Sequence, residues 1–115
     1  MNTKVEKVTG DEIVFDNGWT LSSYHESDCC ESHYLDIGSL SLADFEGLSF
    51  DLSSDAFFER VEDYGIRLIP INGHPVSIAG YGYNNGYYSS QLTLVLERGK
   101  DRKTFDITEC QEVKD

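Results

Sequence analysis

The residues most able to do chemistry stand close together between His25 and His33. These nine positions hold two thiols, two imidazoles and three carboxylates. Such groups bind metals, exchange disulfides or transfer protons. The segment lies between two strand-like stretches and matches no motif of known mechanism. Any argument about function therefore starts from it.

The first interpretation of this segment is a zinc site. Zinc prefers four ligands, and cysteine and histidine are its usual ones. Three of the donors are spaced four residues apart, which would place them on one face if the segment were helical. A distant His74 or Cys110 could complete the site. The candidate zinc ligands are His25, Cys29, Cys30 and His33.

Two other interpretations remain open. A catalytic cysteine needs a lowered thiol pKa, and the neighbouring carboxylates would raise it instead, so we expect no enzyme here. The favoured alternative is structural. Asp28 and Glu31 are spaced as a capping box, and cysteine is among the residues most often buried.

A second group of residues is rich in tyrosine and glycine, between Gly80 and Ser90. Tyrosine offers rigid contact area with a polar tip, and glycine lets a backbone approach a partner closely. The segment therefore indicates a contact surface for a protein, peptide or sugar. A hairpin with tyrosines on alternating sites fits equally well. The candidate interaction residues are Tyr81, Tyr83, Asn84, Asn85, Tyr87 and Tyr88.

The charge is strongly negative and unevenly distributed. The net charge is −12, and the stretch from Val8 to Glu59 contains no lysine or arginine. Such a field repels phosphate, which argues against direct binding of nucleic acid. It favours a basic protein partner or cations. An acidic protein that mimics nucleic acid and blocks a host DNA-binding protein is a further possibility.

Length and composition predict one domain spanning residues 1–115. The polar residues 1–7 contain no apolar signal region, and no apolar run is long enough to cross a membrane. Three cysteines, two of them adjacent, do not fit a disulfide framework, so we expect reduced thiols. Together these features predict a cytoplasmic protein.

Short strands dominate the predicted fold. Alternating apolar residues and turn signals at Asn17-Gly18 and Asn72-Gly73 predict an antiparallel sheet, curled toward a barrel. The residues between Leu40 and Leu52 predict an irregular or short helical connection. Phe57, Val61 and Tyr64 recur at helical spacing, which predicts one main helix near residues 54–64. The expected class is therefore α+β. The predicted strands are 12–15, 19–24, 34–37, 67–71, 75–79, 91–97 and 104–108.

Two blocks of the sequence resemble a small uncharacterised family found in bacteriophages and in bacteria that carry them. They are the block from His25 to Glu31 and the block from Gly80 to Ser90, followed by the apolar residues from Leu92 to Leu96. The resemblance implies a phage-type setting and a domain of unknown function. It assigns no catalytic residue. We therefore expect a phage- or prophage-associated, non-catalytic binding module.

Overall fold

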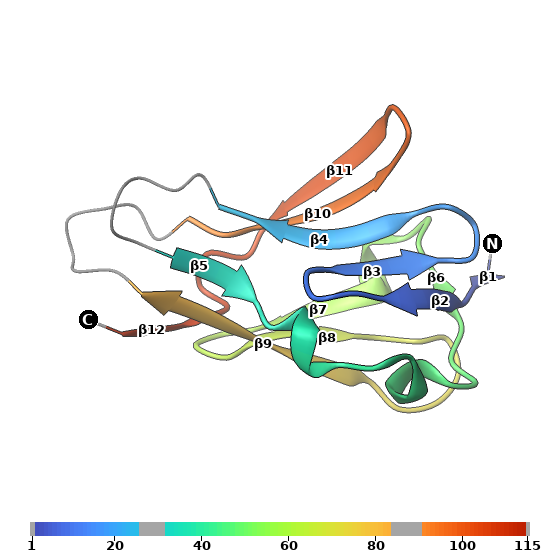
Figure 1. Ribbon diagram of the computed structural model, residues 1–115, viewed down its shortest axis with the longest axis horizontal. Coiled ribbons are helices and arrows are strands. Elements are labelled where there is room, and N and C mark those ends of the chain that lie inside the picture. Colours follow the sequence, from blue (N-terminus) through green and yellow to red (C-terminus); the bar gives the residue numbers. More distant parts are fainter. Residues whose placement is uncertain (1, 26–31, 84–90, 115) are drawn as a thin grey trace.

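Figure 1 shows a computed structural model of the chain, which describes residues 2–25, 32–83 and 91–114. The described residues form an all-β fold of short strands. Two larger sheets carry most of the strands, and a two-stranded sheet pairs β1 with β6. The fold measures 42 × 30 × 23 Å along its principal axes.

The first large sheet has the strand order β11-β10-β4-β3-β2, and every neighbouring pair in it is antiparallel. Gly18 lies between β3 and β4 with a φ of 92°, a conformation that glycine adopts without steric cost. The turn predicted at Asn17-Gly18 is thereby confirmed. The strands are β2 (Val5–Val8), β3 (Glu12–Phe15), β4 (Thr20–Tyr24), β10 (Thr93–Arg98) and β11 (Asp101–Asp106).

The second large sheet has the order β12-β9-β8-β7, and β5 also pairs with β9. Its pairs are antiparallel except for β12 and β9, which run parallel. The strands are β5 (Ser32–Leu35), β7 (Phe58–Val61), β8 (Gly65–Leu68), β9 (Val76–Tyr83) and β12 (Glu112–Lys114). The remaining elements are β1 (Asn2–Thr3), β6 (Phe50–Asp51) and the 3-10 turns η1 (Ile37–Ser39), η2 (Leu42–Phe45) and η3 (Asp55–Phe57).

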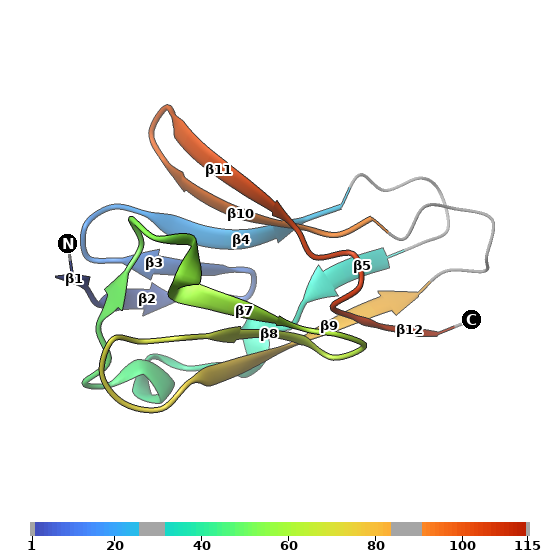
Figure 2. The same ribbon diagram turned by 180° about the vertical axis from the view of Figure 1, so that it is seen from behind.

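One hydrophobic cluster contains side chains from both large sheets. Leu92, Leu94 and Leu96, from the strand predicted at 91–97, are all fully buried in it. Ile66 and Ile78 join them from β8 and β9 and are equally buried. Burying each such side chain stabilises the fold by about 1.5–3 kcal/mol before conformational entropy is counted. The core therefore fixes how the two sheets sit against each other (Figure 2).

The prediction of a main helix near residues 54–64 is wrong, and so is the predicted α+β class. Ser54 does cap a helical turn, because its side chain accepts a hydrogen bond from the Ala56 N–H, but the turn ends at Phe57. The chain then continues as β7, which pairs with β8 in a hairpin. Phe57 and Phe58 are both buried, as suits consecutive aromatic residues where a turn enters a strand. Asp63 turns the chain with a φ of 63°, a value that does not occur inside a right-handed helix.

The expected barrel is also wrong. Among the described residues the strands form separate sheets and no closed barrel, because β11 and β2 end the first sheet without pairing with each other. Some boundaries also differ from those predicted. The strand expected at 34–37 lies at Ser32–Leu35, and the strand expected at 75–79 continues as β9 through Tyr83, into the segment rich in tyrosine and glycine. The irregular or short helical connection predicted between Leu40 and Leu52 is confirmed in part, because it contains the turn η2 but also the strand β6, which was not predicted.

Candidate functional site

Two segments outside the described residues, 26–31 and 84–90, are flanked by residues that contact one another. His25 precedes the first segment, and its Nδ1 donates a hydrogen bond of 2.5 Å to the carbonyl of Gln91, which follows the second. Ser32 and Tyr83, the other two flanking residues, are register partners in β5 and β9. The fold therefore brings the ends of both sequence blocks to one end of the molecule (Figure 1).

His33 is held from the C-terminal part of the chain. It is 5% exposed, and its Nδ1 lies 2.6 Å from Oε1 of Gln111, which is also buried. The Gln111 side-chain NH2 donates to the Thr108 carbonyl at 2.7 Å, which orients its Oε1 toward His33. Because Oε1 can only accept, the His33 Nδ1 carries the proton.

His25 and His33 form a pair, hereafter the histidine pair. Their ring centroids lie 4.5 Å apart at an interplanar angle of 63°, an edge-to-face contact. The Nδ1 of each ring donates to an oxygen, which fixes the orientation of the ring. Histidines that bind metals are oriented in this way by an oxygen on the other nitrogen.

Gly82 makes room for the histidine pair. It is the register partner of His33, and a Cβ at this position would come closer than 3.0 Å to both His33 Nδ1 and Gln111 Oε1. Gly80 similarly leaves room for the Cys110 carbonyl. Gln111 had no signal in the sequence, because a single glutamine outside any motif is expected on the surface.

The second candidate group forms a surface on β5 and β9, hereafter the tyrosine face, made of Tyr34, Tyr81 and Tyr83. Tyr34 and Tyr81 are register partners, and their rings lie 5.9 Å apart. Tyr34 is 47% exposed and Tyr83 is 60% exposed. Tyr34 itself was not among the predicted interaction residues, because its place beside Tyr81 depends on strand pairing.

The structure brings together some of the predicted site residues. His25 and His33 come together, and Tyr81 and Tyr83 share one face. The described part of the chain holds no group of three or more histidine, cysteine, aspartate or glutamate residues arranged to bind a metal. The predicted residues outside the described ranges are Cys29, Cys30, Asn84, Asn85, Tyr87 and Tyr88.

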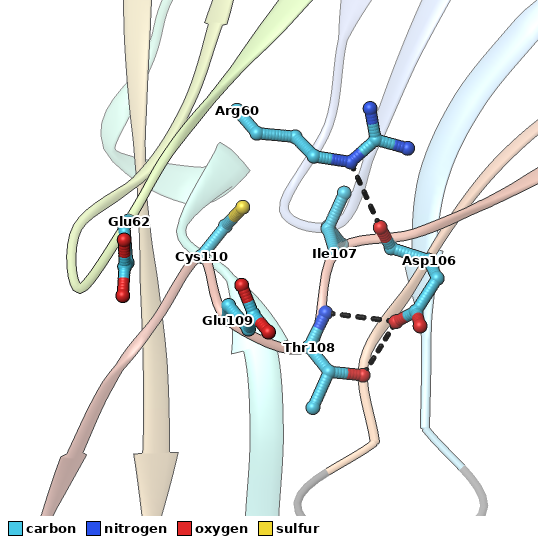
Figure 3. A pocket seen from close by; sticks show the side chains of 7 residues that line it. All are labelled: Arg60, Glu62, Asp106, Ile107, Thr108, Glu109 and Cys110. Atoms are coloured by element: carbon cyan, nitrogen blue, oxygen red, sulfur yellow. Dashed lines mark hydrogen bonds between the residues drawn. The ribbon is translucent and has the colours of Figure 1, made fainter.

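A hollow of about 550 Å³ lies where β7 meets the turn between β11 and β12 (Figure 3). The Arg60 Nε donates to the Asp106 carbonyl at 3.0 Å. The Asp106 carboxylate accepts hydrogen bonds from the backbone N–H and the hydroxyl of Thr108. These bonds lower the pKa of Asp106, the hydroxyl most strongly.

Cys110 also lines this hollow, and it is a free, buried cysteine. Burial raises the pKa of the Cys110 thiol, although Arg60 opposes the effect. A protonated thiol is a poor nucleophile, so this hollow does not favour cysteine catalysis.

Comparison with known proteins agrees with a domain of unknown function. No curated protein and no solved structure matches the chain. Within the described residues no helix is long and apolar enough to cross a membrane. Residues 1–94 match a family described as a domain of unknown function (DUF7448), a range that includes the histidine pair and the tyrosine face but not Gln111. The chain therefore belongs to the DUF7448 family of domains of unknown function.

Proposed function

We propose that this protein is a non-catalytic binding module that recognises a basic protein partner through the tyrosine face. The observation that carries the proposal is the exposure of Tyr34 and Tyr83 on paired strands. The proposed setting is the cytoplasm of a bacterium that carries a phage or prophage, and its support is the resemblance of the two sequence blocks.

The tyrosine face suits binding because its rings are exposed on a framework that is already ordered. Backbone pairing with β9 fixes both β5 and β12, so little conformational entropy is lost when a partner binds. Tyrosine is enriched at protein interfaces because its ring buries apolar area and its hydroxyl stays hydrogen-bonded.

Affinity capture followed by cross-linking mass spectrometry would test this function. The wild-type protein is compared with a Tyr34→Ser/Tyr83→Ser variant, using lysate of bacteria that carry the gene. A Tyr24→Ser/Ile71→Ser variant is the matched control, because those residues are 52% and 54% exposed and lie outside the tyrosine face.

The proposal requires a protein that the tyrosine variant loses and the control retains, with cross-links on β5, β9 or β12. Equal capture by all three proteins would contradict it. Folding of each variant is checked by its amide NMR spectrum.

A second candidate function is zinc binding, and the histidine pair specifically favours it. The Nδ1 protons of His25 and His33 are held by oxygen acceptors, as in metal-binding histidines. Cys29 and Cys30 are the further proposed ligands and lie outside the described residues. Bound zinc would act as a structural cross-link between the histidines and the cysteines.

Elemental analysis of protein purified without chelator or affinity metal tests the zinc proposal. About one zinc per chain is expected, and the bound fraction should fall in a His25→Ala variant. Cobalt substitution adds an independent readout, because thiolate ligands give intense charge-transfer bands. Zinc far below one per chain in the wild-type protein would exclude this function.

A further inference from the structure

A hollow of about 230 Å³ opens on the tyrosine face. It is lined by Tyr34, Tyr81, Gly82, Tyr83 and Glu112. Strand alternation explains the lining, because His33 and Leu35 are buried beneath β5 while Tyr34 between them faces outward. This side of the sheet therefore presents aromatic rings together with a carboxylate.

Three neighbouring strands supply the central row of this hollow. Tyr81 on β9 is the register partner of Tyr34 on β5 and of Glu112 on β12. Gly82 lies between Tyr81 and Tyr83, and because its Cβ position points to the opposite face, toward His33, it contributes only backbone to the hollow. The strand register therefore places Glu112 beside the aromatic residues Tyr81 and Tyr34.

The chemistry of the lining favours a cation. The faces of aromatic rings are negative, and they attract a cation that lies within about 6 Å of a ring centroid. Glu112 adds a formal negative charge, and none of the lining residues is lysine or arginine. The net charge of −12 would attract a basic partner from a distance.

The size of the hollow favours a side chain over a free small molecule. Pockets for drug-sized ligands usually hold about 300–1,000 Å³. Arginine fits better than lysine, because its planar guanidinium stacks on aromatic rings and pairs with a carboxylate through two hydrogen bonds. The chain already contains such contacts, with Arg98 lying 5.0 Å from the ring centroid of Trp19 and Arg60 lying 5.2 Å from that of Phe58.

We propose that this hollow binds an arginine side chain presented by a basic segment of the protein partner. The guanidinium stacks against Tyr34 and Tyr81 and pairs with Glu112. This inference rests on the proposed binding function and names the chemistry that the tyrosine face recognises.

NMR titration with short blocked peptides tests the inference. The probe is a Gly-Arg-Gly peptide, and the control peptide carries citrulline, which has nearly the same shape without the charge. The arginine peptide should shift the ring signals of Tyr34 and Tyr81 in a saturable way. The citrulline peptide should bind at least fivefold more weakly.

Substitutions locate the binding. Glu112→Gln should weaken the arginine peptide about threefold to tenfold, whereas Glu109→Gln, the same change on a nearby exposed residue outside this hollow, should leave it unchanged. Tyr34→Leu keeps apolar area but removes the aromatic face, so it should weaken binding as well.

Three results would overturn the inference. They are equal binding of the citrulline peptide, equal binding of a lysine peptide, and the same shifts with a neutral disaccharide. The outcome is separable from that of the proposed function. If a partner is lost with Tyr34→Ser/Tyr83→Ser while the arginine peptide binds nowhere on this face, the binding function stands and the arginine assignment fails.

Discussion

At the scale of single residues, Gly82 decides whether the histidine pair can form. Its missing Cβ leaves the space that His33 Nδ1 and Gln111 Oε1 occupy. The hydrogen bond between these two groups then links β5 to the chain segment that leads into β12. One small residue in β9 therefore permits a contact between two distant parts of the sequence.

Gly82→Ala should lower the free energy of unfolding by about 1–3 kcal/mol, the usual cost of inserting a methyl group into a packed site. Gly10→Ala is the control, because a Cβ there meets nothing within 4 Å and its change should stay near zero. Denaturant unfolding measures both variants. Equal stabilities of the two variants would contradict the packing described around His33.

Asp106 makes the fold sensitive to acid. Its hydrogen bonds from Thr108 lower the pKa of Asp106 below its ordinary value of 3.8. A carboxyl group whose pKa is lower in the folded state stabilises the protein above its unfolded pKa. That contribution disappears as the pH falls through the lowered folded value.

Asp106→Asn should therefore be less stable than the wild type by up to about 1 kcal/mol at pH 7, because the amide oxygen still accepts both hydrogen bonds but without the strength that the carboxylate charge adds. The difference should shrink as the pH falls below about 4. Urea unfolding between pH 7 and pH 2.5 measures it, with Asp101→Asn as an exposed control on the same strand. A difference that stays constant to pH 2.5 would exclude the charge as its origin.

At the scale of elements, the hairpin of β7 and β8 replaces the predicted helix. The spacing of Phe57, Val61 and Tyr64 is compatible with a helix, but Tyr64 is 44% exposed and does not belong to a common buried stripe. In the hairpin, Phe58 pairs with Leu68 and Val61 with Gly65. Gly65 has no room for a Cβ against the backbone of β9, so it belongs inside the sheet and does not end a helix.

Asp63 distinguishes a hairpin from a helix by the sign of a substitution effect. In the left-handed turn, Asp63→Gly should be more stable than Asp63→Ala by about 1 kcal/mol. In a helix interior the order would reverse by a similar amount. Thermal and denaturant unfolding of the two variants give the sign directly, and the Asp63 N–H can keep its hydrogen bond to the Glu109 carbonyl in both.

At the scale of the whole molecule, the charge of −12 is the dominant feature. Like charges on one compact body repel one another, which opposes folding and attracts cationic partners. Salt screens both effects, since the Debye length falls from about 30 Å at 0.01 M to about 3 Å at 1 M. If the protein mimics nucleic acid and binds a host DNA-binding protein, high salt should dissociate that complex for the same reason.

The melting temperature should therefore rise when sodium chloride is increased from about 0.01 M to 0.5 M at pH 7. A gain of roughly 1 kcal/mol would appear as an increase of about 3–6 °C. Differential scanning calorimetry measures the shift. The control is the same series near pH 4.4, the isoelectric point, where the effect should largely vanish. An equal increase at both pH values would show that charge repulsion is not its cause.

Strands whose pattern is local could be predicted from the amino-acid sequence. Leucines recur at positions 92, 94 and 96 with β-branched residues between them, and Asn17-Gly18 marks a tight turn, so both could be predicted from neighbouring residues alone. The residue types in the sequence also pointed to the two histidines and to the tyrosines of β9. These features depend on interactions within a few positions.

The groups that these residues contact depend on long-range pairing, which becomes visible in the folded structure. Tyr34 meets Tyr81 through the pairing of β5 with β9, and His33 meets Gln111 through a side-chain hydrogen bond, in both cases between segments dozens of positions apart. The choice of hairpin over helix at residues 58–68 likewise depends on β9, which pairs with β8. Local periodicity cannot encode such pairings, because their free energy comes from burial and backbone hydrogen bonds that exist only once the sheets have assembled.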